Sequence, residues 1–146
     1  MGFFGTYVYD GDDWADQDPD STPMLPGPWL MVDIHDGDIT TVTYHPPGPG
    51  TGVAYLGYTP RVYFENDRAS APTDVAREAA GLAAWWAGQQ GDADPARLPA
   101  KEGELRSYLA TDDEDAELDE DLETITTRFL RALDLPVPAD LAEFAG

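Results

Sequence analysis

Alternating aspartates near the N-terminus are the first residues whose spacing could do chemistry. Asp16, Asp18 and Asp20 place carboxylates at every second position, as the first ligands of a calcium-binding loop do. Ser21 stands where such a loop has glycine, and Gly27 stands where it has a bidentate glutamate. We therefore predict a solvated acidic loop without a cofactor, and keep calcium binding at these three aspartates as the alternative.

Histidine chemistry is the second possibility. The chain has two histidines, His35 and His45, which are expected at opposite ends of one hairpin. Asp33 and His35 alternate onto one face of a strand and could form the pair that positions a general base. No serine stands in a G-x-S-x-G setting and cysteine is absent, so a nucleophile is missing. This pattern favours a surface histidine beside a turn.

The charge balance excludes some classes of binding partner without identifying one. The 146 residues carry 29 Asp and Glu against 8 Lys and Arg, a formal net charge of −21, and the single lysine is Lys101. Nucleic-acid phosphates and anionic membrane surfaces would be repelled, because their binding needs clustered cations. A basic protein, a basic peptide or a metal ion would be attracted. Solubility alone, or a salt-adapted proteome, would explain the same composition.

Two local runs hold much of the acidity. Residues 10–20 contain six aspartates, and residues 112–123 contain nine acids in twelve positions. We take residues from both runs as candidates for binding a partner: Asp10, Asp12, Asp13, Trp14, Asp112, Asp113, Glu114 and Asp115. Crowding of carboxylates at the acidic helix start expected in the 112–123 run predicts raised pKa values in the folded state, and hence a stability that increases as the pH drops from about 7 toward 5.

The first half of the chain is expected to form strands. Alternating or β-branched segments lie at 3–9, 29–35, 38–44, 53–58 and 61–65, with a long connection over 10–28. Asp36-Gly37 predicts a hairpin.

The register of this hairpin is open between two choices. A two-residue turn places Leu30, Val32 and Ile34 on one face with Ile39, Thr41 and Thr43. A three-residue loop over 35–37, with Gly37 left-handed, pairs Ile34 with Asp38 and places the same three residues with Thr40, Val42 and Tyr44. We favour the second, because that face is more apolar.

The second half is expected to be helical. Pro72-Thr73-Asp74 opens a helix that ends before Gly91, with Val75, Ala79, Leu82 and Trp86 as its apolar stripe. A short helix is expected over 100–110. Thr111 is expected to cap a third helix, with Glu114 completing a capping box. Pro136 is expected to end this helix.

Aromatic residues concentrate in the strand region. If the helices cover one face of the sheet, the other face is expected to show Tyr and Trp rimmed by Asp, which suits recognition of Arg or Lys. Trp85, beside the buried Trp86, is expected at the edge of the core.

Together these patterns predict one α+β domain over 1–146, β-rich over 1–66 and helical over 72–146. An antiparallel sheet of four to five strands would carry three to four helices on one face. The expected function is a non-catalytic acidic domain that binds a basic protein, as inhibitor, immunity-type or adaptor proteins do. The alternative is a small enzyme or ligand-binding protein that uses carboxylates in an aromatic-lined pocket. No secretory signal is visible, so a cytoplasmic location is expected.

Overall fold

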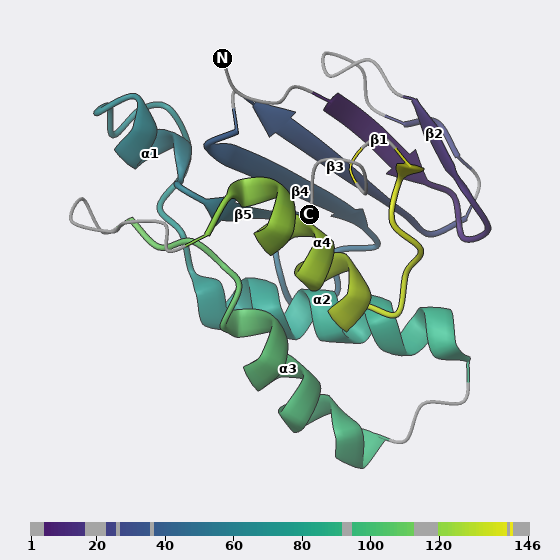
Figure 1. The fold of residues 1–146 in the computed structure, drawn as a ribbon. Coiled ribbons are helices and arrows are strands. Elements are labelled where there is room, and N and C mark those ends of the chain that lie inside the picture. Colours follow the sequence, from purple (N-terminus) through teal and green to yellow (C-terminus); the bar gives the residue numbers. More distant parts are fainter. Residues whose placement is uncertain are drawn as a thin grey trace.

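The computed structural model describes residues 5–16, 23–25, 27–35, 37–91, 95–112, 120–139 and 141, and it shows the predicted α+β architecture (Figure 1). The strands are β1 (Gly5–Tyr9), β2 (Trp14–Asp16), β3 (Trp29–His35), β4 (Ile39–His45) and β5 (Val53–Gly57). The helices are α1 (Pro60–Tyr63), α2 (Val75–Gln90), the 3₁₀ turn η1 (Pro95–Arg97), α3 (Leu98–Arg106) and α4 (Leu122–Ala132). No helix in the described ranges is long and apolar enough to cross a membrane.

The sheet is antiparallel throughout, in the order β2-β1-β3-β4-β5. Strand β2 lies inside the acidic segment that was predicted to be only a connection. A tight turn after β1, with Gly11 at a φ of 102°, brings Trp14 opposite Tyr9. The acidic segment therefore contributes the edge strand of the sheet.

The hairpin of β3 and β4 has the favoured face but a different pairing. Leu30 pairs with Tyr44, Val32 with Val42 and Ile34 with Thr40, so the more apolar set faces the core. Ile34 does not pair with Asp38 as predicted. Gly37 is left-handed, with a φ of 67°. The pairing is shifted by two residues along β4 relative to the prediction, and a shift by two preserves which side chains face inward.

Helices cover one face of the sheet, and Figure 1 shows α4 and α2 against it with α3 beyond α2. The covered face carries Tyr7, Tyr9 and Tyr44 as well as the aliphatic residues of β3. The prediction that tyrosines gather on the other face is therefore wrong for these three. The face that the helices leave uncovered carries a smaller buried cluster of Val8, Trp29 and Met31.

The segment after β5 is a helix and not the predicted strand over 61–65. Thr59 caps α1 by accepting the Val62 N–H, and Pro60 occupies the first turn. Proline has a φ suited to a helix start and no N–H to donate to a sheet. Phe64, which follows the helix, leaves 55% of its surface exposed.

Helix α2 matches the sequence prediction closely. Asp74 caps it by accepting the Arg77 N–H at 3.1 Å, and Gly91 ends it at a φ of 75°. Trp86 is fully buried, and its indole donates to the Asp134 carboxylate at 2.8 Å. Trp85, expected at the core edge, is 2% exposed and donates to the His45 carbonyl.

The last helix begins later than predicted. Helix α4 starts at Leu122, with Asp121 as its N-cap, so Thr111 does not cap it. Asp121 accepts both the backbone N–H and the hydroxyl of Thr124, which explains its advantage as a cap. Asp134 follows the helix at a φ of 59°, and Lys101 of α3 donates to the Ala132 carbonyl at 2.8 Å, which joins the last two helices.

Candidate functional site

The turn between β1 and β2 presents three exposed aspartates on a fixed backbone. The Asp10 carboxylate accepts the N–H groups of Asp12 at 2.9 Å and Asp13 at 3.0 Å. The hydrogen bonds from Asp13 and Asp12 hold the pKa of Asp10 below its usual value. Asp12 and Asp13 are also exposed. The predicted candidates Asp10, Asp12 and Asp13 thus lie together at this turn.

Trp14 is held in place instead of being free at the surface. Its indole N–H donates to the Pro136 carbonyl at 2.7 Å, and its ring lies 5.3 Å from that of Tyr9. The hydrogen bond links β2 to the chain after α4, which sequence reasoning did not foresee. A partner would therefore meet an indole of fixed orientation.

A cavity of about 350 Å³ lies between β2 and the segment Pro136–Ala139. Its walls include Tyr7, Trp14 and the carboxylate-bearing Asp13 and Asp16. Asp16 lies directly opposite Tyr7 in the β1–β2 pair, so both side chains point to the same side of the sheet. We call Asp10, Asp12, Asp13, Trp14 and Asp16 the acidic edge.

The cations of the protein lie elsewhere. Residues 1–60 contain nine aspartates and no Lys or Arg, because all eight bases occur from Arg61 onward. Four bases form ion pairs in the described ranges: Arg61 with Asp67 and Asp112, Arg77 with Glu78, Lys101 with Glu104, and Arg128 with Glu120. None of the ion pairs found there involves the acidic edge.

Asp112 has a different environment from the acidic edge. Its carboxylate accepts the Thr73 N–H at 3.0 Å and lies 3.9 Å from the Arg61 guanidinium. Burial raises the pKa of Asp112, but hydrogen bonds from Thr73 and Thr59 and the charge of Arg61 outweigh it, and the pKa is lowered. The structure shows Asp112 as an internal tether. Asp113, Glu114 and Asp115 lie outside the described residues.

Crowded carboxylates were expected to have raised pKa values, and the described ones that shift do the opposite. The pKa values of Asp10, Asp112 and Asp121 are all lowered. Each of these carboxylates accepts hydrogen bonds from nearby N–H or hydroxyl groups, which favour the ionised form. Local hydrogen bonds, joined at Asp112 by the charge of Arg61, thus outweigh the effect of burial on these pKa values.

Of the three aspartates predicted as an alternative calcium site, the structure describes only Asp16. Asp18 and Asp20 lie outside the described residues, whereas Asp16 belongs to the acidic edge. In the ranges that the structure covers, no group of three or more His, Cys, Asp or Glu residues could hold a metal ion.

The two histidines lie at opposite ends of the hairpin, as predicted. His35 ends β3 and packs edge-on to Tyr63 at 6.0 Å, whereas His45 ends β4 and stacks on Trp29 at 5.7 Å. Asp33 accepts the Thr6 hydroxyl at 2.6 Å. Both imidazoles therefore pack beside aromatic rings.

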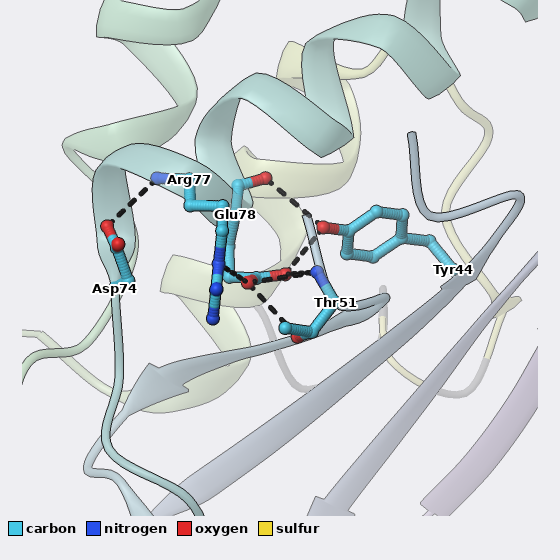
Figure 2. A network of polar contacts seen from close by, with 5 residues as sticks. All are labelled: Tyr44, Thr51, Asp74, Arg77 and Glu78. Carbon is cyan, nitrogen blue, oxygen red and sulfur yellow. Dashed lines mark hydrogen bonds and ion pairs between the residues drawn. The ribbon is translucent and has the colours of Figure 1, made fainter. Parts of the chain in front are cut away.

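A second site, which the sequence did not reveal, surrounds the buried carboxylate of Glu78 (Figure 2). The Tyr44 hydroxyl donates to it at 2.6 Å, and Thr51 donates its N–H and its hydroxyl at about 3.0 Å. The Arg77 guanidinium lies 3.4 Å away. Burial, followed by the hydrogen bond and charge of Glu78, raises the pKa of Tyr44. Tyr44 therefore remains a donor at any physiological pH.

A cavity of about 350 Å³ adjoins this carboxylate. Its walls are mainly apolar, from Val53, Tyr55, Val75 and Leu109, with Glu78 among the polar ones. Both carboxylate oxygens are already engaged by donors. The arrangement could enclose a small molecule, but it leaves Glu78 poorly suited to proton transfer.

No protein family, no curated protein and no solved structure matches this chain.

Proposed function

We propose that the protein is a non-catalytic interaction domain that binds a basic protein through the acidic edge. The observation that carries the proposal is the separation of charge: exposed carboxylates gather at the β1–β2 turn, and residues 1–60 supply no cation. An inhibitor, an immunity-type protein or an adaptor would use such a surface.

Long-range attraction would speed the encounter with such a partner. A net charge of −21 produces a negative potential over the surface, which is screened over about 8–10 Å at physiological salt. Complementary charge raises association rates more than it raises final affinity. Binding to the acidic edge should therefore weaken as salt is added.

The acidic edge is also organised before binding. The Asp10 hydrogen bonds fix the turn, and the Pro136 contact fixes the Trp14 indole. A surface that is already ordered loses less conformational entropy on association. Aromatic side chains in such positions often supply most of the binding energy of an interface.

The test combines capture with a charge-matched control. The tagged protein is used to capture partners from lysate at low and high salt, and a captured protein is purified and titrated directly. Replacing Asp12 and Asp13 with Asn leaves Asp10 to hold the turn, whereas E65Q/E102Q removes the same charge from the exposed Glu65 and from the partly exposed Glu102 of α3.

We expect a basic partner whose affinity falls about two- to thirtyfold in D12N/D13N, from the usual worth of exposed charge pairs. The control variant E65Q/E102Q should lose much less affinity for the same partner. A partner with no excess of Lys and Arg, or equal losses in both variants, would overturn the proposal.

Binding of a small molecule is the second candidate, and the cavity beside Glu78 favours it. Its volume lies at the lower end of the range of about 300–1,000 Å³ that is common for ligand sites. Ligand-observed NMR with mixtures of small acids, amines and neutral amphiphiles would test it. Signals that persist in a variant with Ala110→Leu, which fills the cavity, would show that binding occurs elsewhere.

A further inference from the structure

We propose that β2 accepts an extended segment of the partner as an added β-strand, and that the neighbouring cavity receives an arginine side chain of that segment. This inference rests on the proposed function, since the segment belongs to the basic partner. It adds the mode of binding and the side chain that is recognised.

The two edges of the sheet differ in a way that directs a strand to β2. At the β5 edge, Leu109 forms a bridge with Leu56, and the Ala110 N–H donates to the Tyr55 carbonyl at 2.7 Å. At the other edge, no backbone hydrogen bond joins the outer side of β2 to any residue that the structure describes. An edge strand offers unpaired N–H and C=O groups, which an extended peptide can use.

The cavity beside β2 has the chemistry that an arginine needs. Trp14 and Tyr7 offer aromatic surface, and Asp13 and Asp16 offer carboxylates at the same walls. A guanidinium can stack on an aromatic ring while it donates two parallel hydrogen bonds to a carboxylate. Lysine provides a point charge without this planar fork, so arginine fits the combination better.

Charge also decides which strands may pair with β2. A second copy of the chain would bring its own Asp13 and Asp16 against the first, and like charges disfavour that contact. Charged residues on an edge strand commonly prevent aggregation in this way. A strand rich in arginine is attracted where an identical strand is repelled, so the same carboxylates block self-association and permit the basic partner.

The test uses a short labelled peptide of alternating valine and arginine, followed by fluorescence anisotropy. A second peptide is N-methylated on alternate residues, which keeps its charge but removes backbone donors. A third carries citrulline in place of arginine, which keeps the shape but removes the charge. The protein variants are D16N and, as a matched loss of one charge on another element, E102Q at a partly exposed position of α3. Circular dichroism checks that each variant is folded.

We expect the arginine peptide to bind and the other two peptides to bind at least about tenfold more weakly. D16N should weaken binding of the arginine peptide about two- to fivefold, and E102Q should change it less than twofold, on the usual scale for exposed charges. W14F, which keeps an aromatic ring but removes the hydrogen bond to Pro136, should also weaken it.

Two outcomes would overturn the inference while leaving the proposed function intact. One is equal binding of the N-methylated peptide, and the other is equal effects of D16N and E102Q, provided that D12N/D13N still weakens a basic partner. Failure to bind any arginine peptide or any basic partner would overturn both.

Discussion

The hydrogen bonds around Glu78 allow a quantitative test of what fixes α2 on the sheet. Glu78→Gln preserves the shape of the side chain but replaces one oxygen with an NH₂ group. The amide oxygen can keep the donors Tyr44 and Thr51, whereas the NH₂ group loses the Arg77 contact and must donate to the Thr51 hydroxyl. Bonds to a charged acceptor then become bonds to a neutral one.

The expected cost follows from those bonds. A hydrogen bond to a charged group contributes about 1.5–3 kcal/mol and a neutral one about 0.5–1.5 kcal/mol, so each weakened bond costs about 1–1.5 kcal/mol and three cost about 3–4.5 kcal/mol. Tyr44→Phe removes one donor and should cost about 1–3 kcal/mol. For a chain of this size, each kcal/mol lowers the melting temperature by about 2–4 °C. E78Q should therefore melt about 6–18 °C below the original protein.

Urea unfolding of the single variants and of Y44F/E78Q gives the coupling between the two side chains. We expect the double variant to cost about 1–2 kcal/mol less than the sum of the single ones, because they remove the same bond. E102Q, at a partly exposed position of α3, serves as the control and should change stability by less than about 0.5 kcal/mol. If the two losses of unfolding free energy are additive, or if E78Q costs less than about 0.5 kcal/mol, the hydrogen bonds of Glu78 do not hold α2 on the sheet.

Three further predictions test packing, acid stability and the β2 anchor. In urea unfolding, Gly81→Ala should destabilise the protein by about 1–3 kcal/mol, because its Cβ would lie 2.7 Å from the Pro47 carbonyl oxygen. Gly88→Ala should instead stabilise it by about 0.5–1 kcal/mol, because no atom lies within 4 Å of the added Cβ. The folded-state pKa values of Asp112 and Asp121 are lowered, so their contribution to stability is present above the unfolded value of about 3.9 and is lost as the pH falls through the folded values. Asp121→Ala should thus cost about 1 kcal/mol near neutral pH and clearly less near pH 3, and an equal cost at both would contradict this. Trp14→Phe should cost about 0.5–1.5 kcal/mol of folding stability, because the hydrogen bond to the Pro136 carbonyl is lost. Amide hydrogen exchange should become faster in β2 first. Unchanged exchange in β2 would contradict the idea that this hydrogen bond holds the strand in place.

Most of the fold could be predicted because its elements follow local rules. Periodicity and Asp74 located α2, and alternation located β3 and β4. The prediction failed for 61–65, where β-branched and aromatic residues suggested a strand, because Thr59-Pro60 is also a helix start. Local propensity cannot choose between these outcomes when the segment is short.

The candidate site was harder to predict, because its main features depend on contacts between distant segments. Trp14 and Pro136 are far apart in sequence, so no spacing could suggest their hydrogen bond. Glu78 did carry a clue that was missed: it lies four residues before Leu82 and seven before Trp85, so it occupies a buried helical position. A charged residue in such a position indicates a partner in the folded chain, because an unpaired buried charge is too costly.

The use that the protein makes of its few cations strengthens the case for a functional acidic edge. Arg97 and Lys101 lie over the Trp86 ring at 5.1 and 4.6 Å, Arg61 tethers the chain before α2, and Arg77 pairs with Glu78. These cations are therefore engaged inside the helical layer and do little to neutralise β1 and β2. Solubility alone would be served by acids anywhere on the surface, with cations interspersed. A fold that keeps its cations with the helices and gathers exposed carboxylates beside an ordered tryptophan leaves these carboxylates without a cation from their own part of the chain, and a basic strand could supply one.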